Sequence, residues 1–180
     1  MELSLPLLEA AYYRLSLKLH PDCHPHADLK TRLQVLEQTA HLNEAYATLS
    51  NPQRRALYLL KIYGVDLDDK AKPFQAPPDF LNRLLELREQ FQQAALARQV
   101  DILQSLEHLA KEAMEKAFEL GCQCLRDYLK NGKYETPPVA PSSPPLPPEK
   151  LQQAAAHLVC LRYWQRFLAD IEYSQEELSS

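Results

Sequence analysis

The stretch "LNEAYATLSNPQRRALYLL", residues 42–60, decides the fold of this 180-residue chain because it contains the end of one helix and the start of the next. Its first half repeats apolar residues at helical spacing, at Leu42, Ala45, Tyr46 and Leu49. Asn51 and Pro52 then provide an N-cap followed by proline at the first helical position. Gly64 can terminate the new helix. The stretch therefore predicts two consecutive helices with a short turn between them.

A further helix is predicted before this stretch. Ser4 can cap it, and its apolar residues share one face, at Leu8, Tyr12, Leu15 and Leu19. Pro21 cannot continue a helix, so residues 20–26 form a loop. Asp28 can cap the helix that follows, whose first apolar stripe consists of Leu29, Leu33, Leu36 and Ala40. Residues 1–64 therefore predict three helices.

The chain beyond Gly64 predicts a second helical module. Residues 65–78 lack apolar periodicity and indicate a linker. A helix begins near Asp79, with a core stripe of Phe80, Leu84, Leu87 and Phe91, and pairs antiparallel with a longer helix over residues 98–130. The longer helix has a stripe of Leu103, Leu106, Ala110, Ala113, Ala117, Cys124 and Tyr128. After a proline-rich loop over residues 136–148, a last helix at 149–172 presents Leu151, Ala154, Leu158, Leu161 and Leu168. The sequence predicts an all-α protein whose second module, residues 79–180, is a three-helix bundle.

Composition and charge exclude several classes of function. Only three glycines occur, and the formal net charge of −4 is spread over interspersed acidic and basic residues. Nucleic acid or an anionic membrane would demand a broad basic area, so neither is an expected partner. The four cysteines do not form a disulfide framework, and the chain lacks a signal-peptide core and an apolar span of membrane length. We expect a cytoplasmic protein.

The loop "HPDCHPH", residues 20–26, contains residue types that bind zinc or act as nucleophiles. A structural zinc site requires four ligands, and no second pair of Cys or His residues stands out to complete one with Cys23, His24 and His26. Cys122 and Cys124 point to different sides of a helix and cannot chelate one ion together. We therefore expect no metal or cofactor and no enzymatic activity, with a metal-dependent or thiol enzyme as the alternative.

The helix beginning at Asp79 carries more apolar residues than one core face can bury. Leu81 and Leu85 lie about 90° and 130° from the centre of the core stripe at ~100° per residue. Acidic residues stand beside them, at Glu86 and Glu89, and the last helix offers Val159, Tyr163 and Phe167 away from its own core stripe. These positions predict a mixed apolar and acidic surface for a partner, unless the helix is simply buried on two sides.

Three stretches together resemble one family. They are "YRLSLKLHPD" from Tyr13, "LNEAYATLSNPQRRALYLL" from Leu42 and "FLNRLLELRE" from Phe80. In order and spacing they are similar to the HscB-type J-domain co-chaperones of iron–sulfur cluster assembly. The resemblance implies a J-domain at residues 1–64, a linker at 65–78 and a client-binding bundle at 79–180. It implies docking on a chaperone of the HscA or DnaK class and stimulation of its ATP hydrolysis.

The resemblance also assigns residues to the two expected binding sites. The chaperone would contact a basic pair and a loop triplet, namely Arg14, Lys18, His20, Pro21 and Asp22. The client would be the IscU-type scaffold protein on which the cluster is built, held by Leu81, Leu85, Glu86, Glu89 and Tyr163.

Two departures from the family pattern limit what the resemblance implies. The family's aromatic first helix does not precede the basic helix in this sequence. Either the natural chain begins upstream of Met1, or the apolar surface near Leu42 and Leu49 lacks a cover. In the client surface, Asn82 stands at a usually apolar position and Gln93 at a usually acidic one. A J-protein for another client, or an adaptor with a weakened J-domain, is therefore the alternative within this class.

Overall fold

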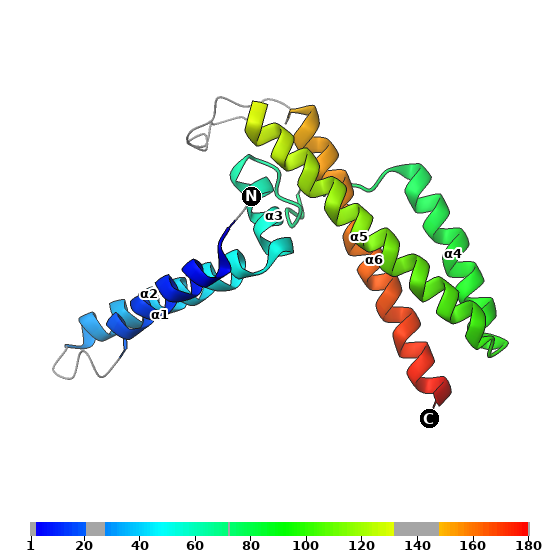
Figure 1. Ribbon diagram of the computed structural model, residues 1–180, viewed down its shortest axis with the longest axis horizontal. Coiled ribbons are helices and arrows are strands. Elements are labelled where there is room, and N and C mark those ends of the chain that lie inside the picture. The colour runs from blue at the N-terminus through cyan, green and yellow to red at the C-terminus, as the bar shows by residue number, and fades with distance from the viewer. Residues whose placement is uncertain (1–2, 21–27, 72, 132–147, 180) are drawn as a thin grey trace. The chain divides into compact units, whose positions relative to one another are not determined.

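The computed structural model describes residues 3–20, 28–71, 73–131 and 148–179, and these form six helices without a strand (Figure 1). The all-α prediction is therefore confirmed. The helices are α1 (Leu5–Lys18), α2 (Leu29–Ser50), α3 (Pro52–Ile62), α4 (Pro78–Leu96), α5 (Val100–Asn131) and α6 (Glu149–Ser179). The chain divides into two compact units, Met1–Leu59 and Leu60–Ser180, and the division falls within α3. The predicted proline-rich loop lies largely outside the described residues.

Capping contacts explain where α2 and α3 begin. The Asp28 carboxylate accepts a hydrogen bond from the backbone N–H of Thr31 at 2.9 Å. Hydrogen bonding by the Thr31 side chain, and then by this N–H, lowers the pKa of Asp28. The Asn51 side-chain oxygen accepts from the N–H groups of Gln53 and Arg54 at 2.9 and 3.0 Å. Both predicted caps are confirmed. Ser4 occupies the N-cap position of α1, but its side chain makes no capping hydrogen bond.

The end of α3 is a glycine-dependent turn. The N–H of Gly64 donates to the carbonyl of Lys61, and the N–H of Val65 donates to the carbonyl of Leu60, at 3.0 and 2.9 Å. Gly64 has a φ of +88°, the left-handed conformation that this paired motif requires and that side chains with a Cβ disfavour. The predicted role of Gly64 as the helix stop is confirmed.

In the first unit, α1 and α2 pack as a hairpin, and Tyr12 of α1 contacts two residues of α2. The Tyr12 and Tyr46 rings stack at 4.3 Å, and the Tyr12 hydroxyl donates to the Asn43 side-chain oxygen at 2.9 Å. Neither helix contains a fully buried residue. The first stripe of α2 remains largely exposed, at Leu29, Leu33 and Leu36.

In the second unit, α5 and α6 pack against each other along most of their length, and α4 lies beside them with fewer contacts (Figure 1). The two long helices approach closely at Gly121, where an added Cβ would lie 3.1 Å from the Leu158 side chain. Most of the predicted core is buried, as are Leu125, Val159 and Phe167. The prediction that Val159 and Phe167 lie away from the core was wrong, because α6 packs against more than one neighbour and buries more than one stripe.

The segment predicted as a linker is packed against α6. Val65 and Ala76 are buried, and Ala76 forms a cluster with Val159 and Cys160 of α6. Phe74 and Leu67 pack against the same cluster. Arg162 of α6 adds a 2.9 Å ion pair to Asp68. Residues 65–71 and 73–77 contain no helix, but these contacts attach them to the bundle.

Replacing Gly64 tests the turn at the end of α3. Gly64→Ala should lower the free energy of unfolding by about 1 kcal/mol, because alanine is strained at positive φ. Gly64→Asn should lose less, since asparagine tolerates this conformation. Thermal unfolding followed by circular dichroism measures both. Equal stability of the alanine variant and the original protein would contradict the turn.

The α5–α6 interface should make stability depend on pH. Burial lowers the pKa of His157 below its ordinary value of 6.5, so the unfolded chain binds this proton more readily than the folded chain. The contribution is complete above pH 6.5 and is lost as the pH falls below it. We expect the melting temperature to drop between about pH 7.5 and about pH 5.5, and His157→Gln to flatten this drop. The exposed residue His41, changed to Gln, serves as the control. An unchanged pH profile in His157→Gln would show that His157 does not cause the pH dependence of stability.

Candidate functional site

The basic pair predicted on α1, Arg14 and Lys18, stands on one exposed face of that helix. The two residues are one helical turn apart, so their side chains point in similar directions. Lys18 lies in the last turn, where a cation is favoured by the helix dipole. The helix ends with a bond from the Leu19 N–H to the Leu15 carbonyl at 3.1 Å, and His20 follows as an exposed residue. Of the predicted triplet, Pro21 and Asp22 lie outside the described residues.

The apolar surface predicted on α4 is exposed to solvent. Leu81 is 37% exposed and Leu85 is 59% exposed, while Leu84 and Leu87 on the core side are buried. Glu86 and Glu89 are exposed beside them. The alternative in which α4 is buried on two sides is therefore wrong for the flank that carries Leu85.

Tyr163 of α6 lies at the same end of the bundle as Leu81. Its ring is 6.0 Å from the ring of Phe80, which in turn contacts Trp164 edge-on at 5.6 Å. Tyr163 remains 40% exposed, whereas Trp164 is buried. Phe80 therefore fixes the start of α4 against α6 and leaves the neighbouring side chains of Leu81 and Tyr163 accessible.

A cross-helix ion pair holds the middle of α4 against α6. The Arg88 guanidinium donates to the Asp170 carboxylate at 2.7 Å, and its central carbon lies 5.9 Å from the centre of the Phe167 ring. The Phe91 ring contacts Phe167 edge-on at 6.0 Å. The sequence analysis missed this pair because its partners are 82 positions apart. We name the line that runs from Phe80 and Tyr163 through Arg88 and Asp170 the α4–α6 seam.

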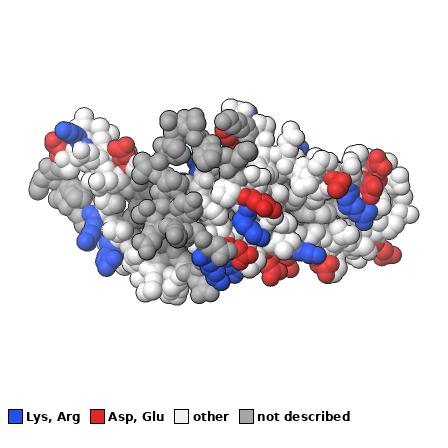
Figure 2. Space-filling view, turned by 90° about the horizontal axis from the view of Figure 1, so that it is seen from above, with Lys and Arg blue, Asp and Glu red and all other residues white. Residues whose placement is uncertain are grey.

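The seam carries charges of both signs. Glu86 pairs with Arg83 at 3.0 Å, and Asp170 pairs with Arg88. Among the described residues, no ion pair is found for Glu89. The face in Figure 2 shows acidic and basic side chains interspersed, without a broad basic area on its described part. The exposed leucines and the neighbouring Glu89 carboxylate therefore favour apolar side chains and a basic group in a partner at this point.

Alternative chemistry finds little support in the described residues. No group of three or more His, Cys, Asp and Glu side chains there could hold a metal ion. Burial raises the pKa of the Cys160 thiol to about 11, so this thiol is not an activated nucleophile. Cys23, His24 and His26, the residues of the metal or thiol alternative, lie outside the described residues. Within the part of the chain that the structure describes, no helix has the length and apolarity to span a membrane.

Comparisons with known proteins match both units of the chain. Residues 4–58 match the DnaJ domain. The co-chaperone HscB homologue of Cupriavidus taiwanensis is 40% identical over 115 residues, which are 63% of this chain and 65% of the relative. The homologue of Neisseria gonorrhoeae is 35% identical over 111 residues, which are 62% of this chain and 66% of the relative. The matched stretches thus span slightly less than two thirds of these relatives.

A solved structure shares the complete fold. The chaperone HscB from Vibrio cholerae superposes with a TM-score of 0.67, covering 98% of this chain and 91% of the other at 23% identity. The N-terminal match identifies a DnaJ domain within the first unit of the chain. Over slightly less than two thirds of its length, the chain is also similar to the HscB-type J-domain co-chaperones.

Proposed function

We propose that the protein is a co-chaperone with no catalytic activity of its own, acting in the cytoplasm. It docks on a heat-shock chaperone of the HscA or DnaK class, stimulates ATP hydrolysis by that chaperone and delivers an IscU-type scaffold protein to it. The observation that carries the proposal is the DnaJ-domain match at residues 4–58 in a chain related to proteins named HscB. The domain boundaries at residues 1–64, 65–78 and 79–180 are part of this proposal.

The chaperone site comprises the basic pair of α1 and the triplet that follows the helix. Exposed Arg14 and Lys18 attract an acidic surface, which mainly affects the association rate and orientation. His20 and Asp22 supply polar contacts, and Pro21 restricts the backbone between them, so that less conformational entropy is lost on binding.

The client site comprises Leu81, Leu85, Glu86, Glu89 and Tyr163. The leucines and the tyrosine ring provide apolar contact area, and the two carboxylates select a basic partner. Phe80 and the Arg88–Asp170 pair hold α4 and α6 in register, so the surface exists before the client arrives.

A second candidate function is an adaptor that binds the client but stimulates no chaperone. It is favoured by the absence of any fully buried side chain in α1 and α2 and by the exposed leucines of α2. A J-domain with so little buried apolar area gains little stability from burial. A different client is the further alternative, supported by Asn82 and Gln93 on the exposed side of α4.

The chaperone role is tested by steady-state ATP hydrolysis of the HscA-type chaperone. The protein should accelerate turnover, and Asp22→Asn or His20→Gln should abolish the acceleration because the docking contacts are lost. Asp28→Asn is the matched control: it removes the same charge nearby, but asparagine caps α2 equally well. Full stimulation by Asp22→Asn would refute the docking role. If neither the original protein nor any variant stimulates the chaperone, the adaptor function is the one that remains.

The client site is tested by calorimetric titration of the IscU-type scaffold. Leu81→Ala combined with Leu85→Ala should raise the Kd roughly tenfold or more, because both side chains lie within the proposed contact. Helicity should be unchanged, since neither side chain is buried. The matched control changes two exposed apolar residues of α5, Ile102→Ala with Leu120→Ala. Unaltered affinity in the α4 variant would remove the client role from this surface.

A further inference from the structure

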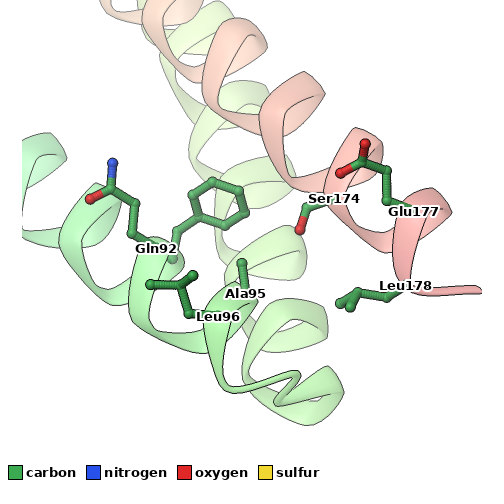
Figure 3. Close-up of a pocket in the computed structure, with 7 residues that line it drawn as sticks. Gln92, Ala95, Leu96, Ser174, Glu177 and Leu178 are labelled. Carbon is green, nitrogen blue, oxygen red and sulfur yellow. The ribbon is translucent and has the colours of Figure 1, made fainter.

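The C-terminal ends of α4 and α6 flank an open pocket that the site described above does not use. Its volume is about 400 Å³, within the range of pockets that bind ligands. In Figure 3, Ala95 of α4 lies opposite Ser174 and Leu178 of α6, Gln92 and Glu177 stand at the edge, and the Leu96 side chain points away from α6. Leu96 is 87% exposed, so a large apolar side chain stands at the mouth of the pocket without a cover.

The pocket continues the α4–α6 seam. On α4, Leu81, Leu85, Gln92 and Leu96 fall within about 60° of one another at ~100° per residue, which places them on one flank. On α6, Tyr163, Asp170, Ser174 and Glu177 share one face by the same spacing. The Arg88–Asp170 pair and the Phe91–Phe167 contact lie between the two ends. The exposed flank of α4 therefore runs along the helix from Leu81 to Leu96, which lines the pocket.

The C-terminal end of α6, which lines one side of the pocket, is acidic. Residues 168–180 contain Asp170, Glu172, Glu176 and Glu177 but no lysine or arginine. Among the nearby cations, Arg88 pairs with Asp170, and Lys111 contacts Glu107 at 2.5 Å and Glu172 at 3.9 Å. The exposed residues Arg98 and Arg166 have no ion pair among the described residues. Among the described residues, no ion pair is found for Glu177, whose carboxylate accepts only the Tyr173 hydroxyl at 2.8 Å. The carboxylates of α6 therefore favour basic groups in a partner on this side of the pocket.

A second pocket extends this surface around the end of the bundle. It is lined by Val100, Leu103, Gln104, Glu107, Gln175 and Leu178, so it shares Leu178 with the first. Its mixture of apolar and carboxylate groups has the same character as the first pocket. The apolar lining at Leu178 is thus flanked by carboxylates on two sides, at Glu177 and Glu107.

We propose that this pocket is a second anchoring point for the client: it takes one apolar side chain, of leucine, methionine or phenylalanine size, from a scaffold segment that also carries lysine or arginine. The inference rests on the proposed client role of the seam. Leu85 and Leu96 are separated by ~16 Å along the helix axis. The client segment therefore spans about three helical turns, with one apolar anchor at each end and its basic residues toward Glu89 and Glu177.

The test titrates the IscU-type scaffold into matched variants of the full chain. Leu96→Ser should raise the Kd roughly fivefold, and Ser174→Leu, which fills the pocket, should do the same. Leu120→Ser, an exposed leucine on α5 outside the pocket, is the control and should bind like the original protein. Glu177→Gln should make the affinity less sensitive to salt, whereas Glu119→Gln should not.

The outcomes distinguish failure of the pocket inference from failure of the proposed function. If Leu85→Ala weakens binding but Leu96→Ser and Ser174→Leu do not, the pocket is no part of the client site and only this inference fails. If the original chain does not bind the scaffold, the proposed function fails and the inference with it. Self-association that Leu96→Ser abolishes, measured by sedimentation, would assign the pocket to a second copy and overturn the inference.

Discussion

In the second unit, α4 carries more apolar area than α5 and α6 can bury. Two long helices, α5 and α6, pack mainly against each other, and α4 can bury only the stripe that includes Leu84, Leu87 and Ala94. Its apolar residues extend well beyond that stripe, so Leu85 and Leu96 remain in water. The exposed leucines along one flank of α4 offer a partner the apolar area that the bundle itself cannot cover.

The contacts that hold α4 in place leave this flank open. Phe80 packs against Tyr163 and Trp164 at one end, and Arg88 reaches Asp170 in the middle. At the N-terminal end, the non-helical segment before α4 is attached to α6 by Arg162, which contacts Asp68 and the Leu67 carbonyl. A surface held in this way loses little conformational entropy when a partner binds, which raises the affinity available from a modest contact area.

Local signals predicted the helix boundaries well, and long-range packing explains what they missed. Asn51, Asp28 and Gly64 act on backbone groups within a few residues, so their roles could be predicted from the sequence. Phe167 was misplaced because one periodic stripe does not show how many neighbours a helix will have. The packing of Phe74 and the Arg88–Asp170 pair likewise join residues that are distant in sequence. The last helix continues to Ser179 because nothing after Glu172 breaks it and its Glu, Gln and Leu residues favour helix.

The central claim is that one flank of α4, together with the facing residues of α6, holds the client. Site-specific photo-crosslinking tests it most directly, with a photoreactive phenylalanine analogue in place of Leu85 in one protein and of Leu120 in another. Both positions are exposed and helical, so they differ only in the surface on which they lie. The account predicts a crosslink to the IscU-type scaffold from position 85 and none from position 120. Crosslinking from position 120 with none from position 85 would contradict it.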